Sequence, residues 1–229
     1  MTSASPSSAL DVAARYDAFA AEHDINEYYT RANPVIRYIE NSRLRIIARM
    51  VQAGPDDRIL EVGCGGGHVL RLFPHSCLTG VDVSDCMLNK ARENLRGYRV
   101  RWLKGELHTL GIPDCSFDRI ICTEVLEHVV DPHTILCEMK RLLAPNGRIV
   151  VTLPNDHLIH RLKSLVHKSG MARLPRCGRT GWGGDDYHLH IWRIAEMREL
   201  LSAYYRITRE CFAPGRWLPI RCCFQCAVA

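Results

Sequence analysis

ILEVGCGGGHVL, residues 59–70, is the stretch that decides the fold of this chain. An apolar strand ends at Glu61, and glycines at alternate positions from Gly63 to Gly67 then crowd the turn into the next helix. Glycine at such a turn lets the backbone approach a ligand closely and adopt dihedral angles closed to other residues. A dinucleotide-binding G-x-G-x-x-G loop would need glycine in place of His68, and a phosphate loop would need a Gly-Lys-Ser/Thr that the sequence lacks. The pattern is E-x-G-x-G-x-G, which alone also fits a tight turn without a ligand.

From Asp57 onward, short β-branched runs alternate with helical stretches. The expected strands are 58–62, 77–83, 98–104, 117–123 and 147–153. Parallel neighbours need crossover connections, so this alternation predicts a parallel sheet with helices on both faces.

Two helices and a hairpin are expected in the second half. The helix 133–144 is opened by Asp131-Pro132 and ended by a turn at Pro145-Asn146-Gly147, and a second helix is expected at 194–204. The runs 205–212 and 221–228 are expected to pair as a terminal antiparallel hairpin.

The flanking regions complete a single expected domain over 10–229. Residues 10–52 read as a helical N-terminal cap with a break at Asn33-Pro34, because apolar residues recur there at helical spacing. Residues 1–9 are polar and expected to be disordered. Residues 155–192 interrupt the alternation as an insertion. The chain length suits one α/β core.

Composition favours a cytoplasmic protein. The eleven cysteines are odd in number and several fall inside apolar runs, which is typical of reduced, buried thiols. Cys223-x-x-Cys226 has no second such pair, so buried thiols are expected there rather than a metal site. The net charge of +5 is mild, so we expect no DNA partner and do not favour an RNA partner. Neither a secretory leader nor a membrane span is expected.

Asp82 ends the second expected strand, nineteen positions after Gly63. An acid at this place in an α/β nucleotide site can accept hydrogen bonds from both ribose hydroxyls. Glu61 and Asp82 would then lie at the carboxyl ends of adjacent strands, where two carboxylates suit a cationic ligand and repel a pyrophosphate. A solvated turn acid is the simpler alternative for Asp82.

From about Asp57 to Leu201 the chain resembles the class I S-adenosylmethionine-dependent methyltransferases, particularly their ubiquinone-biosynthesis O-methyltransferase and small-molecule group. The segments ILEVGCGGGHVL, LKGELHTLGIPDCSFD, ICTEVLEHVVDP and RLLAPNGRIVVTLPN follow the family's order. The resemblance implies a Rossmann-like α/β fold, with a seven-stranded, mostly parallel sheet and an antiparallel last strand. It also implies S-adenosylmethionine as cofactor and S-adenosylhomocysteine as product.

The same resemblance implies which residues hold the cofactor. The glycine loop would wrap its methionine part, with Glu61 near the amino group, and Asp82 would meet the ribose. Glu106 and the backbone of Leu107 would meet the adenine, and the end of the fourth strand would border the methionine. The full expected set is Glu61, Gly63, Cys64, Gly65, Gly67, Asp82, Val83, Glu106, Leu107, Cys122 and Thr123.

His128 is the candidate catalytic base. A hydroxyl or phenol acceptor must lose a proton during methyl transfer, and an imidazole just past the fourth strand titrates near neutrality. The alternative is a packed or helix-capping His128, with geometry alone aligning a more nucleophilic acceptor.

A metal site is a more specific alternative to a catalytic base for the same segment. Glu124, Glu127 and His128, at spacing i, i+3, i+4, could share one helical face, with His188 or His190 downstream. Such a set could hold Mg²⁺, Mn²⁺ or Zn²⁺. It is similar to the E-x-x-E-H…H set of the small-RNA 3′-terminal 2′-O-methyltransferases and to a related motif in ubiquinone-biosynthesis O-methyltransferases. Because E-V-L-E-H-V also occurs in superfamily members without a metal, we do not favour a divalent metal cofactor.

The insertion is expected to shape the acceptor pocket. Residues 156–168 place apolar side chains on one helical face and basic ones around it, which fits a lid over the acceptor or a peripheral contact with a membrane surface. Tyr187, His188 and His190 are expected to bind a flat or aromatic acceptor.

The sequence therefore favours methyl transfer to an oxygen of a small molecule. Three alternatives stay open: transfer to nitrogen or carbon of a secondary metabolite, metal-dependent 2′-O-methylation of an RNA 3′ end, and a cofactor-binding regulatory protein without turnover.

Overall fold

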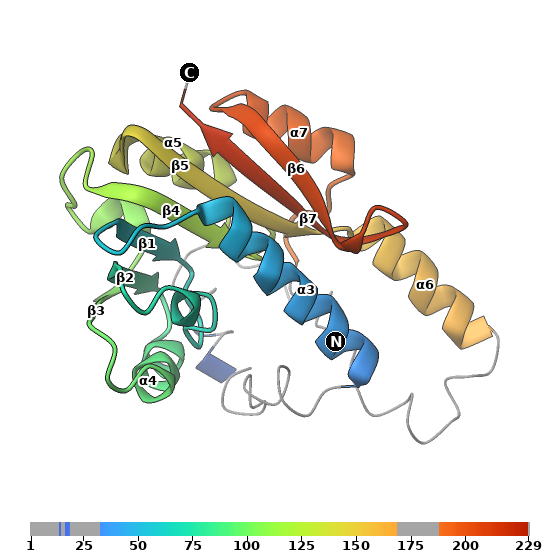
Figure 1. Cartoon of the computed structure of the whole chain (residues 1–229). Helices are drawn as coiled ribbons and strands as arrows, with labels where there is room; N and C mark the ends of the chain where they lie inside the picture. Colours follow the sequence, from blue (N-terminus) through green and yellow to red (C-terminus); the bar gives the residue numbers. More distant parts are fainter. Residues whose placement is uncertain (1–13, 15–16, 19–32, 169–187, 229) are drawn as a thin grey trace.

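The computed structural model of the chain describes residues 14, 17–18, 33–168 and 188–228. A seven-stranded sheet runs through it in the order β3-β2-β1-β4-β5-β7-β6 (Figure 1). Strands β1 to β5 are parallel to one another, and β7 is antiparallel to both of its neighbours, β5 and β6. The strands are β1 (Arg58–Val62), β2 (Cys77–Asp82), β3 (Val100–Lys104), β4 (Phe117–Thr123), β5 (Leu143–Pro154), β6 (Arg206–Gly215) and β7 (Leu218–Ala227). This architecture confirms the predicted fold class and the terminal hairpin.

Helices cover both faces of the sheet (Figure 1). The α-helices are α3 (Pro34–Val51), α4 (Asp85–Asn94), α5 (Pro132–Leu142), α6 (Asp156–Lys168) and α7 (Ile194–Ser202), and the 3₁₀ turns are η1 (Leu70–Leu72), η2 (Leu107–Thr109) and η3 (Leu126–His128). Successive side chains of a strand point to opposite faces. Ile59 and Ile121 accordingly pack with α3 and α4, whereas Leu60 and Ile120 pack with α5 and α7. Both faces of β1 and β4 are thus buried at the adjacent apolar residues Ile59-Leu60 and Ile120-Ile121.

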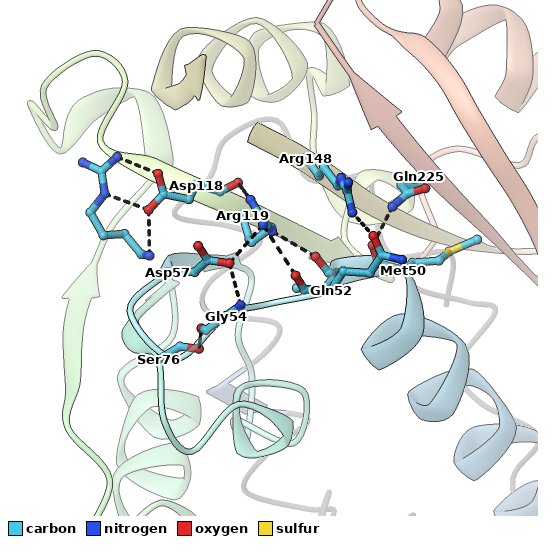
Figure 2. Close-up of polar contacts among 11 residues, drawn as sticks. Met50, Gln52, Gly54, Asp57, Ser76, Asp118, Arg119, Arg148 and Gln225 are labelled. Carbon is cyan, nitrogen blue, oxygen red and sulfur yellow. Dashed lines mark hydrogen bonds and ion pairs between the residues drawn. The ribbon is translucent and has the colours of Figure 1, made fainter. Parts of the chain in front are cut away.

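The amino-terminal edge of the sheet is tied to the end of α3 by polar contacts (Figure 2). The helix ends where Gln52 adopts a left-handed conformation with φ of 48°. Arg119 on β4 pairs with Asp57 at 3.0 Å, and the side-chain amide of Gln225 on β7 donates to the Met50 carbonyl at 2.6 Å. In open α/β sheets ligands bind at the opposite, carboxyl edge. We therefore interpret this network as structural.

One joint differs from the sequence prediction. Helix α5 ends at Leu142 and β5 begins at the next residue, so the predicted turn at Pro145-Asn146-Gly147 lies within β5. The register against β4 shifts between Phe117 and Arg119, and Asn146 has φ of 64°. A left-handed residue of this kind accommodates the irregularity while the strand continues.

The N-terminal break at Asn33-Pro34 begins α3 as expected. The Asn33 side chain accepts a hydrogen bond from the Val35 N–H at 2.9 Å, and Pro34 occupies the first helical turn. The predicted disorder of 1–9 and most of the predicted cap over 10–32 lie outside the described residues.

Helix α6 spans the amphipathic stretch predicted at 156–168, and its apolar face is largely used within the protein. Leu158 and Ile159 pack with Ile39 of α3 and Ile220 of β7, while Leu165 is exposed. The rest of the insertion up to Tyr187 lies outside the described residues. Across the part of the chain that the structure describes, no helix is long and apolar enough to cross a bilayer.

The cysteines that the structure describes are free thiols. Cys223 and Cys226 are buried on β7, as predicted for that pair, and burial raises the pKa of both thiols.

Candidate functional site

The glycine bend follows β1 and has left-handed backbone at alternate positions. Gly63, Gly65 and Gly67 have φ of 64°, 47° and 75°. A Cβ on Gly63 would lie 2.4 Å from Val125 Cγ2, and one on Gly67 would lie 2.2 Å from Leu95 Cδ1, so packing also requires glycine there. A Cβ on Gly65 would meet none of the described atoms within 4 Å. The middle of the bend is therefore a left-handed backbone cradle open to a ligand.

Two buried carboxylates flank this bend, as the sequence predicted. Glu61 Oε2 accepts a hydrogen bond from the Leu70 N–H at 3.2 Å, and Asp82 accepts from the N–H groups of Gly65 and Ser84 at 2.8 and 2.9 Å. Burial raises the pKa of Asp82 and holds that of Glu61 well above its usual range. A positively charged ligand would favour the ionised form of both groups.

The remaining predicted cofactor residues lie along the same edge of the sheet. Cys64 donates its N–H to the Val81 carbonyl at 2.9 Å, and Val83 follows the end of β2. Glu106 precedes η2, whose first residue, Leu107, is buried. Buried Cys122 and Thr123 close β4.

This edge is where the strand order reverses, because β2 and β4 flank β1 on opposite sides. In α/β folds such a reversal leaves a crevice beyond the strand ends in which ligands bind. The structure thus places the predicted cofactor residues along the carboxyl edge of the sheet, near this reversal.

Sequence reasoning missed a contact from the N-terminal region. Ser84 caps α4 by accepting from the Met87 N–H at 3.1 Å, and its hydroxyl donates to the Asp17 carboxylate. Asp17 also raises the pKa of nearby Asp82. A charged residue within a helical pattern gives no local signal of a contact this far along the chain.

Glu124 does not belong with Glu127 and His128 on a helical face, so this part of the sequence interpretation was wrong. The reason is local: Glu124 has φ of 55°, and η3 begins only at Leu126. Its carboxylate accepts from the Thr152 hydroxyl at 2.8 Å and pairs with Arg221 at 3.2 Å. The left-handed residue directs Glu124 toward β5 and β7 rather than toward the rest of the segment.

A cluster of two carboxylates and two imidazoles lies just beyond β4 and β5. Glu127, His128 and His188 each offer a ligand atom, all within 4.8 Å of one another. The imidazole Nδ1 of His188 lies 3.0 Å from Asp156 Oδ2, and the His128 and His188 rings meet edge to face at 4.8 Å between centroids. Below we call Glu127, His128, Asp156 and His188 the His/carboxylate cluster.

Backbone contacts hold the two halves of this cluster together. The Glu127 carbonyl accepts from the N–H groups of Leu189 and His190, at 2.7 and 3.2 Å. The imidazole of His190 instead reaches the Val129 carbonyl at 2.9 Å and stacks on Trp192. Of the predicted acceptor residues, His188 thus joins His128, His190 lies beside them, and Tyr187 is outside the described residues.

Asp156 was read from the sequence only as part of the insertion helix. A usable signal existed: it lies two residues after the end of β5, and the carboxyl ends of neighbouring parallel strands meet at one edge. The distance of 32 positions to His188 hid their contact.

Comparison with known proteins agrees with this site. Residues 60–151 match the family described as methyltransferase domain. The chain is 31% identical over 133 residues to a demethylmenaquinone methyltransferase of Tropheryma whipplei, covering 56% of this chain and 54% of that protein. It is 30% identical over 129 residues to a mitochondrial ubiquinone biosynthesis O-methyltransferase of Schizosaccharomyces pombe, covering 53% and 46%.

The chain is therefore similar to a methyltransferase domain over the segment that includes the glycine bend and the ends of β2 and β4. It spans about half the length of these curated relatives. The fold of the N-methyltransferase NodS from Bradyrhizobium japonicum, solved with S-adenosylhomocysteine, is similar, with a TM-score of 0.69 and 18% identity over 95% of this chain and 98% of that one. S-adenosylmethionine, the cofactor that the sequence resemblance implies, carries a sulfonium and an ammonium group, and such positive charges fit the open cradle at Gly65 between Glu61 and Asp82.

Proposed function

We propose that this chain transfers the methyl group of S-adenosylmethionine to an oxygen of a small-molecule acceptor and releases S-adenosylhomocysteine. The observation that carries the proposal is the placement of two sites on one edge of the sheet. The glycine bend with Glu61 and Asp82 follows β1 and β2, and the His/carboxylate cluster follows β4 and β5. A methyl donor held at the first site can face an acceptor held at the second.

The cofactor supplies an electrophilic methyl group, so the protein has to bind, align and deprotonate the acceptor. Glu61 and Asp82 bind the donor. His128, whose side chain is 16% exposed, is accessible enough to meet an acceptor and is our candidate for the group that handles its proton. The neighbouring imidazole of His188 is positioned by Asp156 to bind the same acceptor.

The names of the relatives support a phenolic or quinol acceptor. The Tropheryma whipplei and Schizosaccharomyces pombe proteins are named for menaquinone and ubiquinone biosynthesis, and a further relative from Desulfotalea psychrophila is named a ubiquinone/menaquinone biosynthesis C-methyltransferase. Imidazole and indole rings at His188, His190 and Trp192 suit a flat ring.

We further propose that the partner is a small molecule rather than RNA, which the mild net charge supports. For α6 we favour a lid beside the acceptor over a membrane contact. The packing of Leu158 and Ile159 against α3 and β7 supports that choice, because it leaves little of the apolar face for lipid.

The test is release of S-adenosylhomocysteine across a panel of phenols, quinol precursors, amines and short RNAs. We expect turnover with a phenol or quinol precursor. His128→Ala should lower kcat by about 100-fold or more, the usual contribution of a positioned proton acceptor, with cofactor affinity unchanged. His133→Ala is the matched control, since His133 is exposed and bonds to the Tyr204 hydroxyl away from the cluster. Turnover with amines alone, or full activity in His128→Ala at every pH, would contradict the proposal.

A further inference from the structure

The His/carboxylate cluster contains buried carboxyl oxygens that its described protein contacts do not satisfy. Both carboxylate oxygens of Glu127 and Oδ1 of Asp156 are buried and have no hydrogen-bond partner among the residues that the structure describes. Glu127 and Asp156 are each only 1% exposed. Leaving a buried carboxylate unsatisfied is costly, and such groups are normally paired with a cation or bound to a metal.

The geometry around Glu127 points to a cation held by imidazoles as well as carboxylate. Glu127 Oε1 lies 3.9 Å from His128 Nε2, too far for a hydrogen bond, and the ligand atoms of Glu127, His128 and His188 are within 4.8 Å of one another. Two atoms that bind one ion at about 2.1 Å are at most about 4.2 Å apart. Ligand atoms that lie 4.8 Å apart would therefore have to approach each other by at least about half an ångström. Two imidazoles and one carboxylate on one side of an ion leave its other positions open.

Asp156 supplies the outer contact that metal-binding imidazoles usually have. A histidine that binds a metal commonly donates its other ring N–H to a carboxylate, which fixes the ring. His188 places Nδ1 3.0 Å from Asp156 Oδ2, which leaves Nε2 as the atom for the ion. The backbone bonds from Leu189 and His190 to the Glu127 carbonyl fix the two ligand-bearing segments against each other. These contacts therefore hold the two ligand-bearing segments together without an ion.

We propose that Glu127, His128 and His188 bind one divalent first-row transition-metal ion, with Asp156 as the positioning residue for His188. Imidazole ligands favour such an ion over Mg²⁺, which prefers an all-oxygen set. An ion here would lower the pKa of an acceptor hydroxyl bound to it and would so promote the same loss of a proton. The binding claim itself stands independently of the proposed function.

The probe is Mn²⁺, measured by electron paramagnetic resonance and by calorimetry on the full chain without cofactor or acceptor. Zn²⁺ would be a misleading probe, because Cys77, Cys115 and Cys137 are exposed free thiols and thiolates are zinc ligands in their own right. We expect one Mn²⁺ per chain in the wild type and in the His133→Ala control. Glu127→Gln and His188→Ala should each weaken Mn²⁺ binding by 10-fold or more.

Asp156→Asn tests the positioning role. Loss of an outer-shell carboxylate should weaken Mn²⁺ binding by about 10- to 100-fold, while S-adenosylhomocysteine affinity stays at the wild-type value. That affinity also serves as the folding check for every variant. If Glu127→Gln fails this check, His188→Ala alone decides the outcome.

Three results would overturn the metal site: no Mn²⁺ binding at millimolar concentration, binding unchanged in both ligand variants, or equal losses in His133→Ala. If the chain binds Mn²⁺ through these residues but methylates no acceptor, the metal site is supported and the proposed function is refuted. If the chain is fully active in excess chelator and binds no Mn²⁺, the proposed function is supported and the metal site is refuted.

Discussion

Glu61 is the residue whose protonation ties cofactor binding to pH. Burial holds its pKa well above the ordinary value of 4.5, so the unliganded fold retains this proton at pH values where the unfolded chain has lost it. The contribution of Glu61 to stability is therefore greatest below pH 4.5 and declines as the pH rises toward the folded-state pKa. A cationic ligand has the opposite preference, because it favours the ionised carboxylate.

We predict that affinity for S-adenosylhomocysteine, which keeps the ammonium group, falls as the pH is lowered from about 8 to about 5, by at most about tenfold per pH unit for one proton. Glu61→Gln should bind more weakly and show a shallower pH dependence, with Asp82 supplying what remains. Calorimetry at several pH values measures both. An unchanged pH profile in Glu61→Gln would show that this carboxyl group does not meet the cofactor.

Two separate requirements favour glycine at position 63, a left-handed backbone and close packing against Val125, and substitutions can separate them. An alanine there would need a left-handed backbone, which costs about 1–2 kcal/mol, and its Cβ would overlap Val125. Gly97 offers a matched control, because it has φ of 88° and open space around the site of a Cβ. We predict that Gly63→Ala loses more unfolding free energy than Gly97→Ala and that Val125→Ala recovers part of the difference. Urea unfolding of Gly63→Ala, Gly97→Ala, Val125→Ala and the double variant Gly63→Ala/Val125→Ala checks this, and equal losses at both glycines would refute the packing argument.

The positions of the candidate cofactor residues were predictable because each depends on short-range chemistry. The left-handed backbone of the turn favours glycine at Gly63 and Gly65. At the end of β2, an acid such as Asp82 can accept hydrogen bonds from a ligand. Glu124 was misplaced because its left-handed conformation replaces a helical start, and the local sequence EVLEH does not reveal that choice. The contact of Asp156 with His188 depends on the path of the chain through the insertion, which no local pattern encodes.

At the scale of elements, α3 is locked to the sheet by a buried ionic network. Glu40 on α3 pairs with Arg43 at 2.8 Å and with Arg221 of β7 at 3.2 Å, and all three side chains are largely buried. Burial alone would raise the pKa of Glu40, but attraction to the two arginines outweighs it and leaves the pKa below its usual value. This carboxylate thus stabilises the fold above the unfolded pKa, and that stability is lost as the pH falls through the lower folded value.

We predict that Glu40→Gln lowers the free energy of unfolding by about 3–5 kcal/mol, because it removes the buried negative charge that two buried guanidinium groups share. The surface pair of Asp118 with Arg58 is the control, and Asp118→Asn should cost no more than about 1 kcal/mol. Denaturant unfolding at neutral pH compares the two. Similar small losses would mean that α3 is held by apolar packing alone.

The order of elements was predictable, because apolar runs and their helical spacers recur with a regular rhythm from β1 to β5. The joints were less predictable. At the start of β5, the pairing of Phe117 with Leu143 extends the strand through Pro145-Asn146-Gly147, whose local sequence is typical of a turn. Sheet pairing between distant segments decided that boundary.

At the scale of the whole molecule, the two edges of the sheet have different tasks. The amino-terminal edge carries the Arg119 and Gln225 contacts that fix α3 (Figure 2). The carboxyl edge carries the glycine bend and the His/carboxylate cluster, with several carboxylates whose burial is unfavourable without a cation. Burial of these carboxylates therefore costs free energy at the carboxyl edge, and a cationic ligand can offset that cost. The stability of the fold should therefore depend on ligand binding.

We predict that S-adenosylhomocysteine at about 100 times its Kd stabilises the wild-type fold by about 2.7 kcal/mol, which for a chain of this size corresponds to a rise in Tm of roughly 5–10 °C. Asp82→Ala removes the expected ribose contact and the acceptor for the Gly65 N–H, so a 100-fold loss of affinity would leave only about 0.4 kcal/mol at the same concentration. Asp118→Ala, which alters an acid at the opposite edge, should retain the full shift. Thermal unfolding with and without ligand separates these cases. If Asp82→Ala gained as much as the wild type, the ligand would be bound elsewhere than at the bend, and the assignment of this edge as the cofactor site would fail.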